Sequence, residues 1–123
     1  MDDGVGEIMS ALRELSLDRN TLVMFLPDNG AGGVADPTPF NAGGSQIDRM
    51  GEGGIRLSFI ARWPGVLPAG CSTDEFLSIL DVFPTRAAVG GARIPDGLTL
   101  DGFNLLPVLQ GKERSPRQSM FWH

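Results

Sequence analysis

The sequence predicts an α/β fold from three observations. Two apolar segments rich in β-forming residues, Thr21–Leu26 and Ile55–Trp63, are typical of strands. Helical periodicity precedes the first segment and follows the second. The order helix, strand, long loop, strand, helix is that of part of an α/β sheet protein. A chain of 123 residues is enough for one modest core, so we expect residues 1–123 to form a single partial domain.

The first predicted element is an amphipathic helix over residues 4–17. Apolar side chains recur there at three- and four-residue spacing: Val5, Ile8, Met9, Leu12 and Leu15. We expect Asp2 or Asp3 to cap its start. After a turn at residues 18–20, Thr21–Leu26 is predicted to be a strand buried on both faces. Pro27 ends it, because proline has no N–H to donate to a neighbouring strand.

Residues 30–54 form a long Gly-rich loop, of a length that is usually functional or disordered. The second strand, Ile55–Trp63, ends at Pro64-Gly65. Ser72–Val89 is predicted to be helical, with an apolar side in the core and an end at Gly90-Gly91. That side comprises Phe76, Leu77, Leu80 and Phe83.

Pro84 lies inside the second helical pattern and is expected to kink or restart the helix, with Asp81 capping the restart. Residues 92–104 are predicted to be a polar connection. Leu105–Leu109 should form a helical turn closed by Gly111, and Ser119–Trp122 a last strand.

Composition restricts the partners and the compartment. The net charge is -5 and no basic cluster stands out, so we expect neither nucleic acid nor an anionic membrane as partner. The single cysteine excludes an intrachain disulfide. No apolar run is long enough to span a bilayer, and Asp2-Asp3 gives the wrong charge for a secretory signal. The compartment therefore stays open.

Asp28-Asn29-Gly30, directly after the first predicted strand, is the principal candidate site. A carboxylate next to a carboxamide offers two oxygen ligands to one hard cation. In open α/β sheets, ligands bind outside the carboxyl ends of the strands. The alternative is ordinary turn chemistry, because Asp and Asn side chains hydrogen-bond their own backbone after a strand. From the tripeptide alone, the turn is favoured.

A series of segments resembles the second half of a type I sulfatase, in the family's order and near its spacings. The segments are Asp2–Ile8, Leu12–Leu15, Asn20–Val23, Asp28–Gly30, Glu52–Arg56, Phe59–Gly65, Asp81–Thr85, Asp101-Gly102 and Leu105–Leu109. The resemblance covers nearly the whole chain. It implies part of an alkaline-phosphatase-like fold and, as the family activity, hydrolysis of sulfate esters at a calcium and formylglycine site.

The resemblance transfers only some of the family's site residues. Asp28 and Asn29 match its calcium pair. The formylglycine pattern Cys/Ser-x-Pro-x-Arg is missing, because Cys71 precedes Ser-Thr-Asp-Glu. The loop that would hold the sulfate-binding lysine, Thr38–Gly51, has none, which leaves Arg49 as a candidate substrate contact. We therefore assign no catalytic residue, and expect a sulfate ester substrate only if an N-terminal half completes the site.

Two other functions stay open. A non-catalytic binding module on a truncated α/β scaffold would use the loop over 30–54 for recognition. Open edges of a truncated sheet would invite pairing with another chain, so a cooperative monomer would favour the module and self-association would favour a fragment. A phosphoesterase relative would need more histidines than His123 alone. We expect Cys71 to be an ordinary thiol. Arg62 is expected to form an ion pair at least as readily as it would contact an anion. Trp63 is expected to be a packing residue.

Overall fold

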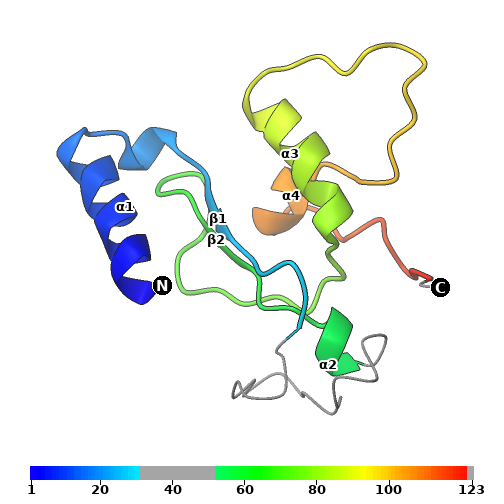
Figure 1. The fold of residues 1–123 in the computed structure, drawn as a ribbon. Coiled ribbons are helices and arrows are strands. Elements are labelled where there is room, and N and C mark those ends of the chain that lie inside the picture. Colours follow the sequence, from blue (N-terminus) through cyan, green and yellow to red (C-terminus); the bar gives the residue numbers. More distant parts are fainter. Residues whose placement is uncertain (31–51, 122–123) are drawn as a thin grey trace. The chain divides into compact units, whose positions relative to one another are not determined.

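The computed structural model describes residues 1–30 and 52–121. Along the chain lie α1 (Asp2–Glu14), the 3-10 helix η1 (Asp18–Asn20), β1 (Val23–Phe25), α2 (Glu52–Ile55), β2 (Ile60–Arg62), the 3-10 helix η2 (Ile79–Asp81), α3 (Val82–Val89) and α4 (Leu106–Leu109). β1 and β2 pair in a two-stranded sheet (Figure 1). The predicted α/β fold class is confirmed, with strands shorter than expected.

The chain divides into two compact units. One comprises Met1–Val23 with Arg62–Gln118, and the other Met24–Ala61 with Ser119–His123. The division passes through β1 and β2, so each unit is described separately. The single-domain prediction and the predicted self-association through sheet edges stay predictions.

The helix α1 confirms the first predicted element, although it begins and ends earlier than expected. Its N-cap is Met1 and makes no side-chain capping bond, so the predicted Asp cap is wrong. Asp2 and Asp3 lie in the first turn, where negative charge interacts favourably with the helix dipole. The helix ends in a Schellman motif, in which Leu17 N donates to Leu12 O at 2.8 Å.

The two strands are only half-buried, so the prediction of a strand buried on both faces is wrong. Phe25 is 38% exposed and Ile60 60% exposed. Each strand has one neighbour among the described residues. Ile55, placed in the second strand by its sequence, belongs to α2.

The helix predicted over Ser72–Val89 begins at Ile79 instead, so its first half is wrong. Residues 72–78 form neither helix nor strand, and Ser78 and Asp81 form a capping box that starts η2 at this point. Pro84 lies in the first turn of α3, where a missing N–H costs nothing, and Asp81 occupies the predicted N-cap position of α3 without a side-chain capping bond to that helix. Gly90-Gly91 ends α3 as predicted, with Ala92 N bonded to Ala87 O at 2.8 Å.

The predicted apolar core side of that segment is largely exposed. Phe76 is 37% exposed, Leu80 42% and Phe83 60%. The buried apolar residues of the described chain are Leu105 and Val108, at α4, and Pro84 in α3. α4 is the predicted helical turn, closed by Gly111 at φ +69°. Residues 119–121 form no strand, and Trp122 and His123 lie outside the described residues.

Asp81 is the centre of a buried polar cluster. Its carboxylate is fully buried and accepts three hydrogen bonds, from Ser78 N at 2.8 Å, Phe103 N at 2.9 Å and Arg117 Nη2 at 2.6 Å. These donors come from the start of the helix, from the connection before α4 and from the segment after α4. One carboxylate therefore joins three stretches of chain that are distant in sequence.

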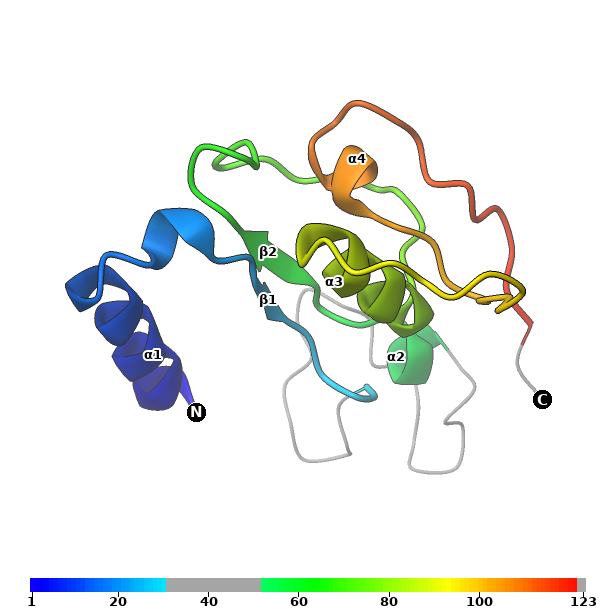
Figure 2. The same ribbon diagram turned by 90° about the horizontal axis from the view of Figure 1, so that it is seen from above.

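Thr85 and Arg117 complete this Asp81 cluster. The Thr85 hydroxyl donates to Asp81 O at 2.6 Å and accepts from Leu105 N at 2.8 Å, which fixes the approach to α4. α4 lies beside α3 in this unit (Figure 2). Arg117 Nη2 also donates to Asp101 O at 3.0 Å, and its Cζ lies 5.1 Å from the centroid of the Phe103 ring. The Arg117 guanidinium thus interacts with the Asp81 carboxylate, the Asp101 carbonyl and the face of the Phe103 ring.

Gly102 allows the segment that connects α3 to α4 to approach η2 closely. A Cβ at this position would lie 2.0 Å from Leu80 O and 3.0 Å from Asp81 N. Contacts that short do not occur, so the backbone would have to separate. Glycine is therefore required for Phe103 N to reach the Asp81 carboxylate.

The Asp81 cluster predicts a large stability loss for Asp81→Asn. Removing the charge leaves Arg117 buried and unpaired, since the two side chains are 1% and 8% exposed, and such losses are about 3–5 kcal/mol. The free energy of unfolding from urea titration measures this. Asp96→Asn is the matched control, because its Arg93 pair is as short but 82% and 87% exposed, and no measurable change is expected. Equal effects of both substitutions would contradict the role of the cluster.

Gly102→Ala should also destabilise the chain, because the new methyl group collides with Leu80 O. We expect the thermal midpoint to fall by roughly 5 °C or more. Gly6→Ala is the control, since a Cβ there meets no atom within 4 Å and alanine favours a helix. A Gly102→Ala chain that melts like the unsubstituted chain would show that the close approach is not needed.

Candidate functional site

The candidate site is the turn Asp28-Asn29-Gly30, which follows β1 after Leu26-Pro27. The chain bends at Asp28 and Asn29, and both residues are exposed. Gly30 N donates to Gly54 O of α2 at 2.9 Å, so the end of the turn is fastened beside that helix (Figure 1). A backbone hydrogen bond therefore sets the course of the chain that carries the two polar side chains.

The side-chain oxygens of Asp28 and Asn29 accept no hydrogen bond from the described residues. Asn29 Nδ2 donates to Gly30 O at 2.9 Å, which occupies the amide nitrogen and orients the carboxamide. The Asn29 amide oxygen and the Asp28 carboxylate make no hydrogen bond or ion pair within the described ranges. The local turn bond expected of such a tripeptide is present at Asn29 and absent at Asp28 among these residues.

The side-chain oxygens of this turn are of the type that a hard cation prefers, but they are too few to complete its coordination sphere. A carboxylate and a carboxamide oxygen are ligands that calcium prefers, but calcium takes about six to eight oxygens. Within residues 1–30 and 52–121, no group of three or more His, Cys, Asp or Glu residues is placed to hold a metal ion. Asp28 and Asn29 would thus form part of a coordination sphere, completed by water or by other residues.

The other predicted site residues do not gather at this turn. Arg49 and His123 lie outside the described residues. Arg62 pairs with Asp18, Nη2 to Oδ2 at 4.0 Å, which confirms the ion pair that we expected of it. Trp63 Nε1 donates to Arg19 O at 2.9 Å, as a packing residue would.

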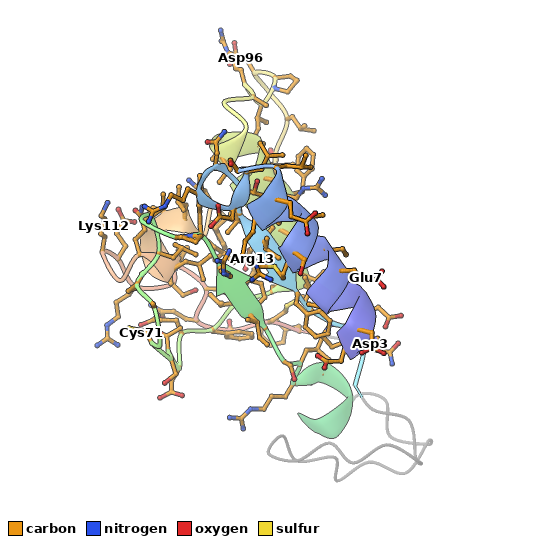
Figure 3. The ribbon with its side chains drawn as sticks, turned by 90° about the vertical axis from the view of Figure 1, so that its left-hand side faces the viewer. Asp3, Glu7, Arg13, Cys71, Asp96 and Lys112 are labelled. Carbon is orange, nitrogen blue, oxygen red and sulfur yellow. The ribbon has the colours of Figure 1, made fainter. Side chains whose placement is uncertain are left out.

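Cys71 has the setting of an ordinary thiol. It is exposed on the loop after β2 (Figure 3), and its closest polar contact is Ala69 O, 3.7 Å from Sγ. Among the described residues, no hydrogen bond or ion pair brings Cys71 the base or the cation that would activate a thiol nucleophile.

An open cavity beside α4 does not resemble an anion site. Its walls are residues 72–76, Val108 and 111–114, which bring Lys112 and Arg114 close to three carboxylates. Glu75 is already engaged, since it accepts from Ser115 N at 2.7 Å and lies 3.9 Å from Arg114. The positive charge is therefore balanced locally and does not converge on a ligand position.

The sequence did not predict Arg117 as the partner of Asp81. Asp81–Thr85 and Asp101-Gly102 stood out as motifs, but Arg117 lies 36 positions from Asp81 and belongs to no motif. The indirect signal was chemical, because a buried carboxylate requires a cation or several N–H donors.

None of the helices in the described part of the chain is long and apolar enough to cross a lipid bilayer.

Comparisons with known proteins agree with one another. The Sulfatase family model matches residues 1–92, which include Asp28, Asn29 and Asp81. Human arylsulfatase A is 43% identical over 129 aligned positions, covering 100% of this chain and 24% of that protein. Human steryl-sulfatase is 40% identical and is covered over 22% of its length.

Solved structures give the same result. The crystal structure titled Ps i-CgsB matches with a TM-score of 0.80 at 36% identity, over 92% of this chain and 25% of that one. The PsFucS1 sulfatase from Pseudoalteromonas sp. matches with a TM-score of 0.76 at 31% identity, over 93% and 24%.

The matches establish the fold and the family. The described structure is a small α/β piece of the alkaline-phosphatase-like fold of sulfatases. The chain spans about a quarter of the length of the relatives it matches. Hydrolysis of sulfate esters is the activity of this family, and its members are metal-dependent enzymes. The family-model match over residues 1–92 and the agreement in fold show that this chain belongs to the sulfatase family.

Proposed function

We propose that this chain supplies part of the metal centre of a sulfate ester hydrolase, with Asp28 and Asn29 as two oxygen ligands of calcium. One observation carries the proposal. An adjacent carboxylate and carboxamide, with oxygens not engaged by the described residues, follow a strand inside the segment that matches the sulfatase model. Ligand sites at the carboxyl ends of strands are general in α/β sheets.

Each residue of the turn has a distinct part in this proposal. Asp28 provides negative charge and Asn29 a neutral oxygen, oriented by the bond from its own Nδ2 to Gly30 O. The bond from Gly30 N to Gly54 O fixes the backbone that carries both side chains. A bound calcium ion would supply positive charge to stabilise a sulfate group as its ester bond breaks.

The nucleophile must come from outside these 123 residues. No Cys/Ser-x-Pro-x-Arg pattern occurs in the sequence, and Cys71 lacks both the proline and the arginine of that pattern. Charge stabilisation does not replace a covalent nucleophile, so we expect the chain alone to be inactive.

The incomplete ligand set predicts weak calcium binding by the chain alone. Two protein oxygens out of about six to eight leave most of the coordination sphere to water. Isothermal titration of the full chain with calcium chloride should give no submicromolar site. A submicromolar dissociation constant that survives Asp28→Ala would show that calcium binds elsewhere in the chain.

A chimera tests the role of the turn in catalysis. The matching quarter of human arylsulfatase A is replaced by this chain, and hydrolysis of a chromogenic aryl sulfate is measured with and without calcium. In an active chimera, Asp28→Ala should lower kcat/KM by about 100-fold or more, because metal charge contributes several kcal/mol to such reactions. Asn29→Ala should act in the same direction.

Asp74→Ala is the matched control in the chimera. Asp74 is equally exposed, and lies away from the turn in sequence, so its removal should leave kcat/KM unchanged. Full activity of an Asp28→Ala, Asn29→Ala chimera would refute the proposed ligands. Turnover by the 123-residue chain alone, retained in that double variant, would indicate chemistry of another kind.

A further inference from the structure

Asn29 and Gly30 form a pair that can react with itself. The main-chain nitrogen of the residue after an asparagine can attack the side-chain amide carbon, and glycine hinders that attack least because it has no Cβ. Asn29 is exposed and lies in a bend outside any helix or strand, so water reaches its amide. The other asparagines among the described residues, Asn20 and Asn104, precede a threonine and a leucine, whose side chains hinder the attack.

The reaction balances with water as the only co-reactant. Gly30 N loses its proton and bonds to Asn29 Cγ, the Cγ–Nδ2 bond breaks, and the amide nitrogen leaves as ammonia with that proton. The product is a five-membered succinimide ring. Water then opens the ring, which gives aspartate when the bond from Cγ to Gly30 N breaks and isoaspartate when the main-chain bond breaks. No atom changes its oxidation state.

Two hydrogen bonds restrain both reacting groups in the structure. Gly30 N donates to Gly54 O at 2.9 Å, so the proton that must be lost is held by α2. An amide N–H exchanges its proton only when such a bond opens. Asn29 Nδ2 donates to Gly30 O at 2.9 Å, which holds the leaving amide in place. Both bonds must open before the ring can close.

We propose that Asn29 is a deamidation site, kept unreacted by the bond from Gly30 N to Gly54 O. The acceptor belongs to α2, which has only four residues, Glu52–Ile55. A single helical turn is marginal by itself, so α2 opens more readily than the chain as a whole unfolds. Opening of α2 releases Gly30 N and starts the conversion of a neutral amide into a carboxylate beside Asp28.

The product changes the turn in two ways. Aspartate places a second negative charge next to Asp28, and isoaspartate adds a methylene group to the main chain. Under the proposed function, the neutral oxygen ligand at Asn29 would thus be lost with age. That consequence rests on the proposed function, whereas the reaction itself requires no metal.

Asp96-Gly97 is an internal comparison, because it lacks the restraining bond. An aspartate before glycine forms the same succinimide, with water as the leaving group. Gly97 N makes no hydrogen bond with the described residues, and the turn is closed instead by Leu98 N, which donates to Pro95 O at 3.2 Å. The pair of Asp96 with Arg93 is 87% and 82% exposed, so it restrains the carboxylate little.

The test follows conversion of each site by peptide mass spectrometry during incubation at neutral pH. The full chain is compared in buffer and in urea, with a chelator present, and the arylsulfatase A chimera provides a second folded context. Asn29 should convert about tenfold or more faster in urea than in either folded context, since a hydrogen bond contributes about 1 kcal/mol. Isomerisation at Asp96 should differ by a smaller factor. Hydrogen exchange at Gly30 should show the same protection as Asn29.

One variant opens α2 directly. Proline at position 55 disfavours helical backbone at Gly54, so Ile55→Pro should displace the acceptor. Conversion of Asn29 in buffer should then rise about tenfold, towards the rate in urea. The amides of Phe103 and Leu105, which are bonded in the other unit, should keep their slow exchange and show that the change is local.

Two further variants identify the route. Asn29→Gln would require a larger ring, so conversion at this position should cease in urea. Gly30→Ala places a Cβ beside the attacking nitrogen and should slow the conversion in urea. Isomerisation at Asp96 should be the same in both variants as in the unsubstituted chain.

Three outcomes would overturn the inference. Absence of conversion at Asn29 in urea would show that it is not a deamidation site. Equal rates in urea and in both folded contexts would show that the bond to Gly54 gives no protection. Unchanged conversion in Ile55→Pro, with faster exchange at Gly30, would assign the protection to another contact. None of these readouts involves calcium or turnover, so an active Asp28→Ala chimera would refute the proposed ligands and leave this inference intact.

Discussion

The buried Asp81 carboxylate is the interaction on which the larger unit depends. A carboxylate without exposure is costly unless its oxygens are paired, and here three donors from three stretches of chain pair them. The buried apolar residues at α4 are few, so hydrophobic burial alone would hold this unit weakly. Gly102 and Thr85 bring backbone N–H groups into reach of the cluster and thereby shape the path from α3 to α4.

This arrangement suits a segment that works within a larger domain. Apolar side chains on α1, η2 and α3 remain exposed, while the Asp81 carboxylate and the Thr85 hydroxyl are buried and hydrogen-bonded. The candidate metal turn belongs to the other unit, where a backbone bond to α2 fixes it. The local structure thus holds the Asp81 cluster in a defined position and leaves these apolar side chains exposed.

Sequence patterns that span a few residues predicted the elements whose structure depends on neighbouring residues. The spacing of α1, the end of α3 at Gly90-Gly91 and the turn of α4 were predicted, because periodicity and glycine termini act over a few residues. Phe76–Phe83 was wrongly assigned to the core and Ser72–Ser78 to a helix. Apolar spacing does not say which polypeptide covers a face, and the capping box of Ser78 and Asp81 starts the helix late. Asp81 and Arg117 are far apart in the sequence, and no periodicity or motif indicates that they pair.

The central claim is that Asp28 and Asn29 are ligands of a calcium ion in a sulfate ester hydrolase. The most direct measurement is a crystal structure of the arylsulfatase A chimera grown with calcium, with the ion located by anomalous diffraction. The account predicts an ion about 2.3–2.6 Å from an Asp28 carboxylate oxygen and from the Asn29 amide oxygen. An ion bound elsewhere, with Asp28 hydrogen-bonded to its own backbone, would contradict it.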